Sequence, residues 1–334
     1  MARILLTGGA GYIATHVAVC ALKAGHEVVL FDNFSNSEPH VLLNLHTIIG
    51  KKPVLKEGDI RDTGVLAEFM KEQRVTAVIH LAGLKSVEES LENPEMYFGN
   101  NVEGTKSLLA AMERCEINRL VFSSSATVYG EPEYLPLDES HSLRAVNPYA
   151  ESKIRVEKIL EDKCREDQRW RIVSLRYFNP VGSHDSGLLG DNPKALRANI
   201  MPMIARVLTG KREYLEVYGN DYDTPDGTCL RDYIHVMDLA EGHISTLDYL
   251  ANAQGYTAIN LGAGIGISVL EMVKAFEMVT GQRIPLRFAP RRDGDVPACY
   301  ANCDKARELL NWESRRSLEE MCESTWHWCK RIES

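Results

Sequence analysis

The sequence predicts an α/β protein with a doubly wound parallel sheet of the Rossmann type, followed by a smaller α/β lobe that binds substrate. Short runs rich in Val, Ile and Leu recur along the first half of the chain. Each run is continuously apolar, as in strands that are buried on both faces. The segments between these runs have the three- and four-residue apolar spacing of amphipathic helices. Strands and helices that alternate in this way indicate a doubly wound fold.

The first half of the chain supplies six strands and the helices between them. We expect the strands at residues 3–7, 27–31, 53–56, 77–81, 120–124 and 172–176. We expect amphipathic helices directly after the first strand and at residues 63–73, 102–115 and 149–164. Together these elements make a first domain over residues 1–180.

The second half, residues 181–334, is expected to form the smaller lobe. Gly, Asp, Asn and Pro become frequent there, so loops are more common. We expect helices at 201–208, 268–280 and 318–330, strands at 215–218 and 258–261, and a strand followed by a helix over 233–250. This lobe covers the carboxyl ends of the sheet, and the chain around 230–250 returns to the first domain.

The composition excludes several classes of function. The chain has 334 residues, with 38 Lys and Arg against 47 Asp and Glu and a formal charge of −9, so it lacks the basic surface that nucleic-acid binding requires. It contains no run of about 18 apolar residues that would span a membrane. Its 8 cysteines are scattered without metal-ligand spacing. That pattern favours free thiols in a cytoplasmic protein and argues against a metal site.

A glycine-rich turn follows the first predicted strand and opens a helix. The turn reads Thr-Gly-Gly-Ala-Gly-Tyr-Ile-Ala over residues 7–14. Gly8 and Gly11 let the backbone approach a pyrophosphate closely, and the helix N-terminus attracts the negative charge. Asp32 ends the next strand about 20 residues later, where a carboxylate accepts hydrogen bonds from a ribose and repels a 2′-phosphate. The pattern predicts a dinucleotide site and favours NAD over NADP.

Tyr149 and Lys153 form the candidate catalytic pair. They lie four residues apart on a predicted helix and therefore share one face of it. The preceding strand ends in Ser123, Ser124 and Ser125, at the sheet edge where the nicotinamide is expected. A cation beside a phenol stabilises its anion, so we expect Tyr149 to act as a base beside Lys153. Ser125 is expected to form a hydrogen bond with the substrate oxygen from which Tyr149 removes the proton.

Several longer motifs extend over nearly the whole chain, at residues 7–13, 82–85, 122–130, 175–182, 226–228, 231–240 and 289–292. With these motifs the chain resembles the extended short-chain dehydrogenase/reductase family, and within it the UDP-sugar 4-epimerases. The resemblance implies reversible C4 epimerisation of UDP-glucose and UDP-galactose through a 4-keto sugar, with tightly bound NAD. It also implies a homodimer formed through helices near residues 94–115 and 149–164.

The resemblance further implies which residues bind the two ligands. The implied cofactor-binding residues are Gly8, Gly11, Tyr12, Ile13, Asp32, Asn33, Asn36, Ser37, Asp59, Ile60, Leu81, Ala82, Gly83, Lys85, Asn100, Ser123, Tyr149, Lys153 and Phe178. The implied substrate-binding residues are Lys85, Ser125, Tyr149, Tyr177, Asn179, Asn199, Glu216, Val217, Tyr218, Arg231, Arg292, Asp295 and Cys299.

Cys299 bears on the choice of sugar. In the family this position borders the C2 substituent, and a small residue leaves room for an N-acetyl group where Tyr does not. We therefore expect activity on UDP-GlcNAc and UDP-GalNAc as well, with a small buried thiol of no such consequence as the alternative interpretation.

Other functions stay open at this point, namely those of a nucleotide-sugar 4,6-dehydratase, a decarboxylase or a non-catalytic NAD-binding sensor. Dehydratases and decarboxylases of the family carry an acidic residue just after the strand-end hydroxyl, whereas Ala126 and Thr127 follow Ser125 here. A sensor should lack the Tyr and Lys pair, which this chain keeps.

Some details depart from the family pattern or have a purely structural interpretation. The catalytic helix reads Ala-Glu-Ser between Tyr149 and Lys153, where the family usually has Gly-Lys in the middle, and the preceding loop is one residue short. His235 and Asp238 are expected to cap the helix that follows them. Trp326, His327 and Trp328 are expected to be packing residues of the last helix.

Overall fold

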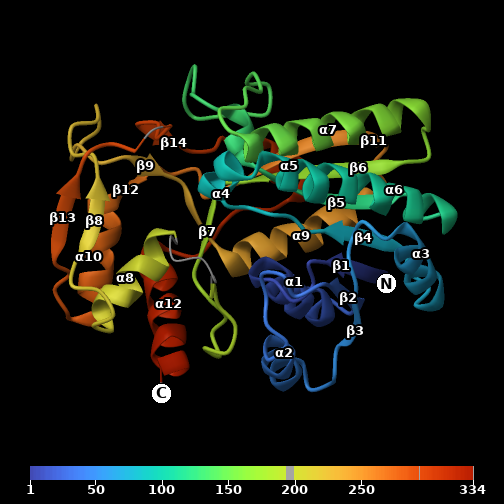
Figure 1. Ribbon diagram of the computed structural model, residues 1–334, viewed down its shortest axis with the longest axis horizontal. Coiled ribbons are helices and arrows are strands. Elements are labelled where there is room, and N and C mark those ends of the chain that lie inside the picture. Colours follow the sequence, from blue (N-terminus) through green and yellow to red (C-terminus); the bar gives the residue numbers. More distant parts are fainter. Residues whose placement is uncertain (193–198, 293, 334) are drawn as a thin grey trace.

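The computed structural model describes residues 1–192, 199–292 and 294–333 of the chain. A seven-stranded sheet lies at its centre, in the order β11-β6-β5-β4-β1-β2-β3, and neighbouring strands are parallel throughout (Figure 1). The chain leaves β1 towards β2 and β3 and then crosses to β4 on the other side. The strand order therefore reverses between β1 and β4, where such sheets bind ligands at the carboxyl ends of their strands. The predicted fold class is confirmed.

The strands of this sheet are β1 (Arg3–Thr7), β2 (Glu27–Asp32), β3 (Val54–Glu57), β4 (Ala77–His80), β5 (Arg119–Ser125), β6 (Arg171–Tyr177) and β11 (Gly255–Leu261). The longer helices beside it are α1 (Tyr12–Lys23), α2 (Val41–Ile49), α3 (Thr63–Glu72), α6 (Gly104–Arg114), α7 (Pro148–Glu166) and α9 (Val236–Leu250). The first six strands end within one residue of their predicted bounds. The strand expected at 258–261 in the second lobe is instead β11, at the edge of the large sheet.

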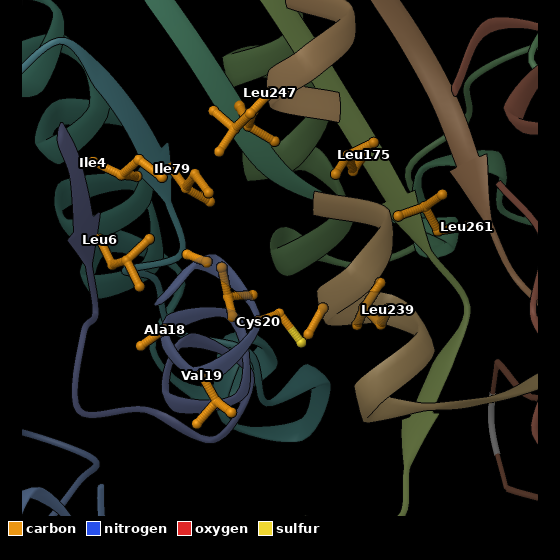
Figure 2. Close-up of a cluster of buried hydrophobic side chains, with 14 of the residues drawn as sticks. Ile4, Leu6, Ala18, Val19, Cys20, Ile79, Leu175, Leu239, Leu247 and Leu261 are labelled. Carbon is orange, nitrogen blue, oxygen red and sulfur yellow. The ribbon is translucent and has the colours of Figure 1, made fainter. Parts of the chain in front are cut away.

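The strand side chains alternate between two apolar cores, one on each face of the sheet. Ile4 and Leu6 of β1 point towards α1 and α9, in the same cluster as Ala18 and Leu239 (Figure 2). Leu5, between them, belongs to the cluster on the other face, which α3, α6 and α7 cover. Both faces are thus largely excluded from water, which explains why the central positions of strands such as β1 and β4 are apolar without alternation.

A smaller group of helices and short strands lies beyond the carboxyl ends of the sheet (Figure 1). It contains α8 (Ile200–Leu208), β8 (Leu215–Tyr218), α10 (Val269–Thr280), β13 (Leu286–Ala289) and α12 (Leu318–Glu333). These elements share a third apolar core, with β8 and β13 paired in parallel. The domain division at residue 180 stays a prediction, because α9 and β11 from the second half pack with the large sheet.

The remaining elements are short. They are α4 (Val87–Glu92), α5 (Pro94–Tyr97), the π-helical turn η1 (Phe98–Glu103), the 3-10 turn η2 (Ala126–Tyr129), β7 (Asn179–Val181), β9 (Leu230–Arg231), β10 (Tyr233–His235), β12 (Ile267–Ser268), β14 (Ala298–Cys299) and α11 (Asp304–Leu310). Among all these helices of the described ranges, none has the length and apolar character needed to cross a membrane.

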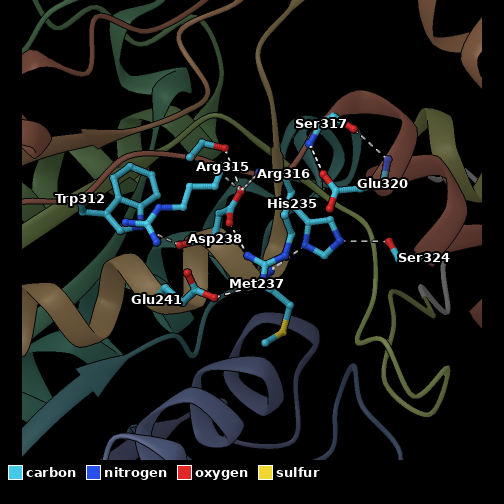
Figure 3. Close-up of polar contacts among 11 residues, drawn as sticks. His235, Met237, Asp238, Glu241, Trp312, Arg315, Arg316, Ser317, Glu320 and Ser324 are labelled. Carbon is cyan, nitrogen blue, oxygen red and sulfur yellow. Dashed lines mark hydrogen bonds and ion pairs between the residues drawn. The ribbon is translucent and has the colours of Figure 1, made fainter.

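His235 and Asp238 anchor the start of α9 in different ways (Figure 3). His235 caps the helix as predicted, because its Nδ1 accepts a hydrogen bond of 3.1 Å from the backbone N–H of Met237. The expectation that Asp238 caps the same helix is wrong. Its carboxylate accepts from the backbone N–H groups of Arg315 and Arg316, at 3.0 and 2.9 Å, and pairs with the Arg316 guanidinium. Asp238 therefore fixes the segment that leads into α12.

Replacing Asp238 with Ala should lower the free energy of unfolding by about 3 kcal/mol, because the change leaves buried donors and a cation without their partner. Urea-induced unfolding would measure the loss. Glu241→Ala is the matched control, since Glu241 binds the same Arg316 at 3.1 Å from a side chain that is 42% exposed. We expect a change below about 1 kcal/mol for this control. Equal losses in both variants would contradict the anchoring role of Asp238.

Candidate active site

A cavity of about 320 Å³ opens at the carboxyl ends of β1, β2, β5 and β6. Of the residues predicted to bind the cofactor, all except Asp59 line it. The Asp59 carboxylate forms an ion pair of 2.6 Å with Arg61 instead. The cavity thus gathers loops that follow neighbouring strands, including the loop from Leu81 to Lys85 after β4, into one concave site, as ligand sites of parallel sheets do.

The glycine turn after β1 approaches the backbone of the loop after β4 closely, and both segments line this cavity. Gly8 has a φ of +66°, and a Cβ atom there would lie 2.8 Å from the backbone nitrogen of Ala82. Gly11 begins α1 without a side-chain cap, so no side chain covers the N–H groups of the first turn. Tyr12 and Ile13 of that turn line the cavity. These features make this part of the cavity suited to an anionic group.

Asp32 orders the glycine turn and the loop after β2, which both line the cavity. One carboxylate oxygen accepts a hydrogen bond of 2.9 Å from the backbone N–H of Ala10. The other accepts from the backbone N–H of Phe34 at 2.7 Å and from the Ser37 hydroxyl at 3.0 Å. A carboxylate can accept about four hydrogen bonds. Asp32 therefore orders the loop after β2 and keeps capacity for a ligand hydroxyl.

The candidate catalytic residues Ser125, Tyr149 and Lys153 meet in the lining of the same cavity. Asn147 caps α7 by accepting a hydrogen bond of 2.8 Å from the backbone N–H of Ala150, which fixes the first turn and Tyr149 within it. One turn later, the Lys153 Nζ donates a hydrogen bond of 2.7 Å to the carbonyl of Ser123. The same nitrogen lies 5.8 Å from the centre of the Tyr149 ring. The helix and the end of β5 therefore hold the phenol and the ammonium side by side.

Ser125 is oriented as a donor towards Tyr149. Its Oγ accepts hydrogen bonds from the backbone N–H and the hydroxyl of Thr127, at 3.3 and 3.0 Å. The Ser125 proton is then left for the Tyr149 hydroxyl, with which the serine side chain interacts. Sequence reasoning did not single out Thr127, because its contact with Ser125 depends on the 3-10 turn that follows β5.

Burial and hydrogen bonding act in opposite directions on Tyr149. Burial raises the pKa of Tyr149, whereas the hydrogen bond from Ser125 lowers it. Burial lowers the pKa of Lys153 to about 8, and the carboxylate of Glu157 acts against that effect. Lys153 therefore still carries its proton at neutral pH, and its positive charge faces a phenol that needs one in order to ionise.

Tyr177 contributes its ring to the cavity but not its proton. Its hydroxyl contacts Nε2 of His243, while Nδ1 of the same histidine lies 2.8 Å from the carbonyl of Leu239. A carbonyl only accepts, so Nδ1 carries the histidine proton and Nε2 accepts from Tyr177. The Tyr177 hydroxyl is thus committed to α9, which the sequence could not show because His243 is 66 residues away.

Other cavity contacts escaped sequence reasoning as well. Asn101, in the π-helical turn, accepts a hydrogen bond of 2.8 Å from the N–H of Leu84 and donates one of 3.1 Å to Ser152, which ties the loop after β4 to α7. Lys85 lies 3.7 Å from Asp191 across the cavity. Trp328, expected only to pack, lines the cavity too. All of these pairings join distant parts of the chain and leave no local pattern.

The residues predicted to bind substrate divide into two groups. Lys85, Ser125, Tyr149, Tyr177 and Asn199 line the cavity, whereas Asn179, Glu216, Val217, Tyr218, Arg231, Arg292, Asp295 and Cys299 do not. Most members of the second group lie together in the smaller lobe, where Asp295 joins the guanidinium groups of Arg231 and Arg292 at 3.4 and 2.9 Å. Within the described residues, no cluster of His, Cys, Asp or Glu side chains could hold a metal ion.

Comparisons with known proteins agree with this geometry. The family model described as GDP-mannose 4,6 dehydratase matches residues 5–325. The chain is 50% identical over 325 residues to UDP-glucose 4-epimerase of Bacillus subtilis, covering 97% of this chain and 96% of that protein. It is 47% identical over 336 residues to the human UDP-glucose 4-epimerase, covering 98% and 97%.

Solved structures give the same result. The UDP-glucose-4-epimerase of Stenotrophomonas maltophila with bound NAD and formylated UDP-arabinopyranose matches with a TM-score of 0.98 and 44% identity, over 100% of this chain and 99% of that one. The UDP-glucose 4-epimerase of Bifidobacterium longum in complex with NAD+ and UDP matches with a TM-score of 0.94 and 45% identity, over 98% of each chain.

Proposed function

The chain belongs to the UDP-glucose 4-epimerases of the extended short-chain dehydrogenase/reductase family, and on that premise we propose that Tyr149, Lys153 and Ser125 interconvert UDP-glucose and UDP-galactose. The protein is an NAD-dependent isomerase. The observation that carries the proposed residue roles is the phenol of Tyr149 between the Ser125 hydroxyl and the Lys153 ammonium, at the edge of the cofactor cavity.

The cavity residues fit NAD. A Cβ atom at Gly8 would lie 2.8 Å from the backbone of Ala82 and one at Gly11 would lie 3.0 Å from the Gly8 carbonyl, so the tight turn needs glycine, and the uncapped start of α1 suits the pyrophosphate. Asp32 retains one acceptor position for the adenosine ribose and would repel a 2′-phosphate. When bound, NAD would supply a hydride acceptor for C4 of the sugar and a hydride donor for the 4-keto sugar, so the cycle would consume no oxidant.

Tyr149 is proposed as the base that removes the proton from the 4″-hydroxyl group. A phenol ordinarily titrates near pH 10, so its ionisation at neutral pH needs about 4 kcal/mol of stabilisation. A unit charge about 6 Å away supplies roughly 3 kcal/mol at an effective dielectric constant of about 20. Lys153 therefore supplies most of the stabilisation, and the positive charge of the oxidised cofactor adds to it.

Ser125 is proposed to donate a hydrogen bond to the reacting oxygen of the sugar while keeping its own proton. Thr127 already occupies two acceptor positions of the Ser125 oxygen, so the serine proton can point only towards Tyr149 and the space beside it. That proton would stabilise negative charge on the sugar oxygen as it leaves its own proton on Tyr149.

Dehydration is disfavoured although the matching family model is named after a dehydratase. Expulsion of water from C6 needs a proton donor near the strand-end hydroxyl. The residues that follow Ser125 are Ala126 and Thr127, and the Thr127 hydroxyl is bound to Ser125 at 3.0 Å. Among the described relatives, those at 46 to 50% identity are UDP-glucose 4-epimerases.

The smaller lobe is proposed to hold the UDP moiety. Arg231 and Arg292 both face the Asp295 carboxylate, and two forked cations in one place suit a diphosphate. Glu216 to Tyr218 would run along the uracil. Within that strand the Val217 side chain is buried in the lobe, so it would contribute its backbone.

Cys299 is proposed to leave room for an N-acetyl group. It pairs with Arg231 between β14 and β9, and it packs against the cluster that contains Phe178, which lines the cavity. These contacts support the proposal that the thiol lies between the proposed diphosphate residues and the cofactor cavity, where the sugar ring would bind.

We also propose a homodimer in the cytoplasm. Leu91 of α4 and Met96 of α5 are 62% and 43% exposed beside α7, which leaves apolar surface for a second copy. All 8 cysteines are free thiols, as in a reducing compartment. Light scattering after size-exclusion chromatography tests the dimer, and a monomer mass at micromolar concentration would exclude it.

Tyr149→Phe and Lys153→Met should each lower kcat for UDP-galactose by about 1,000-fold, because general-base catalysis contributes roughly 100- to 10,000-fold. A coupled assay for UDP-glucose would measure the loss. Tyr134→Phe is the matched control, because Tyr134 is 43% exposed and does not line the cavity. Turnover near the wild-type rate in both active-site variants would refute the assignment.

Cys299→Tyr should reduce turnover of UDP-GlcNAc by about 10- to 100-fold, because a bulky side chain in a filled site costs about 1 to 3 kcal/mol. Turnover of UDP-galactose should change less than about 3-fold. Assays of both substrates with one enzyme preparation would measure the ratio. If wild-type protein does not turn over UDP-GlcNAc at all, the proposed role of Cys299 fails.

A further inference from the structure

A buried ion pair lies behind Lys153 and has no part in the mechanism above. Glu157 follows Lys153 by one turn of α7, and its side chain is 3% exposed. Its partner, Arg176 of β6, is 5% exposed, and the closest nitrogen and oxygen are 2.7 Å apart. Burying two charges is costly, and a buried pair is often no more stable than apolar residues of the same size. Its presence beside the catalytic helix therefore calls for another explanation.

The Glu157 carboxylate is held by four donors. Arg176 binds both oxygens, with its Nε 3.1 Å from one and its Nη2 2.7 Å from the other. The hydroxyl groups of Ser124 and Tyr256 add hydrogen bonds of 2.5 and 3.2 Å. A carboxylate bound by this many donors, two of them from one guanidinium, is held in a single orientation. Glu157 is thus a negative charge fixed in position.

This charge is directed at Lys153 by the geometry of two elements. Residues four apart on a helix are neighbours, so Lys153 stands between Tyr149 and Glu157 on one face of α7. On β5, the Ser123 carbonyl binds the Lys153 ammonium, and the next residue, Ser124, binds the Glu157 carboxylate. The end of β5 therefore holds the lysine cation and the glutamate anion at adjacent positions.

The other groups around Lys153 do not replace this anion. His80 of β4 is buried and its pKa is lowered to about 3, so it is neutral. The Phe122 ring of β5 lies 4.8 Å from the ammonium and carries no charge. Lys85, on the loop after β4, is paired with Asp191 at 3.7 Å. The Arg176 guanidinium is paired with Glu157 itself and lies over the Tyr129 ring.

We propose that Glu157 is a positioning residue that keeps Lys153 protonated against Tyr149, with Arg176 holding the glutamate in place. The inference rests on the proposed roles of Tyr149 and Lys153. Burial pulls the pKa of Lys153 down to about 8, and Glu157 opposes this effect. Without the glutamate charge, Lys153 loses its proton at lower pH, and the phenolate loses the cation that stabilises it. Catalysis should then fail earlier as the pH rises.

The first test compares the pH dependence of kcat in Glu157→Gln and Arg176→Met, both purified with bound NAD. For Glu157→Gln, the alkaline limb of the profile should move to lower pH by about one pH unit, the size expected when a nearby opposite charge is removed. For Arg176→Met, the anion next to Lys153 stays, so the alkaline limb should not move to lower pH. A downward shift in Glu157→Gln without one in Arg176→Met distinguishes an electrostatic role of Glu157 from a structural one.

Equal downward shifts in both variants, or no shift in either, would overturn the proposal. Each single variant leaves one buried charge without its partner, which can prevent folding. The double variant Glu157→Gln/Arg176→Met carries neither charge, and its alkaline limb should still lie at lower pH than that of wild type. Wild-type protein that carries NAD but does not epimerise UDP-galactose would refute the proposed function instead.

A second readout does not depend on turnover. The ultraviolet absorbance of ionised Tyr149 is obtained as the difference between each protein and the same protein carrying Tyr149→Phe, with NAD bound. At a pH where Tyr149 and Lys153 together hold one proton, that proton lies either on the lysine or on the tyrosine. Loss of the Glu157 charge favours the tyrosine, so Glu157→Gln should show a smaller phenolate fraction than wild type. An unchanged fraction would contradict the role of Glu157.

Discussion

The site depends on a positive charge kept in a buried place. Lys153 is surrounded by the end of β5, the Phe122 ring and the catalytic helix, and burial alone would drive its proton off. In the proposed mechanism, the same ammonium makes Tyr149 a usable base. Three groups stabilise the buried ammonium of Lys153: the backbone carbonyl of Ser123, the face of the Phe122 ring and the fixed carboxylate of Glu157. The surrounding protein thus stabilises the lysine charge, and the lysine charge stabilises the tyrosine anion.

The topology of the doubly wound sheet by itself brings the cofactor-binding and catalytic residues together. Parallel strands end at one edge of the sheet, so the glycine turn after β1, Asp32 after β2 and the serines at the end of β5 face a common cavity. The cores on both faces of the sheet leave little freedom to these strand ends. A cofactor that is oxidised and reduced within one cycle needs such fixed surroundings, because its reactive face and the sugar must stay in register.

Much of this arrangement follows from local sequence. The six strands of the first half, the turn with Gly8 and Gly11, and the Tyr149 and Lys153 pair are each written in a few neighbouring residues, and the residues implied for the cofactor, Asp59 excepted, do line one cavity. The remainder is carried by contacts between distant segments. The place of β11, the link from Asp238 to Arg316 and the tie from Tyr177 to His243 depend on packing that no local pattern records. Nothing in the local sequence sets Glu157 apart from the other charges of its helix, because its partner Arg176 lies on β6.

The central claim is that Tyr149 ionises because Lys153 is charged beside it. Nuclear magnetic resonance of protein with carbon-13 in its tyrosine rings tests this directly, with NAD bound and the Tyr149 signal assigned by its loss in Tyr149→Phe. The account predicts that Tyr149 titrates well below the ordinary range of a phenol and that Lys153→Met moves this titration upward by about two pH units. The same titration in both proteins would contradict it.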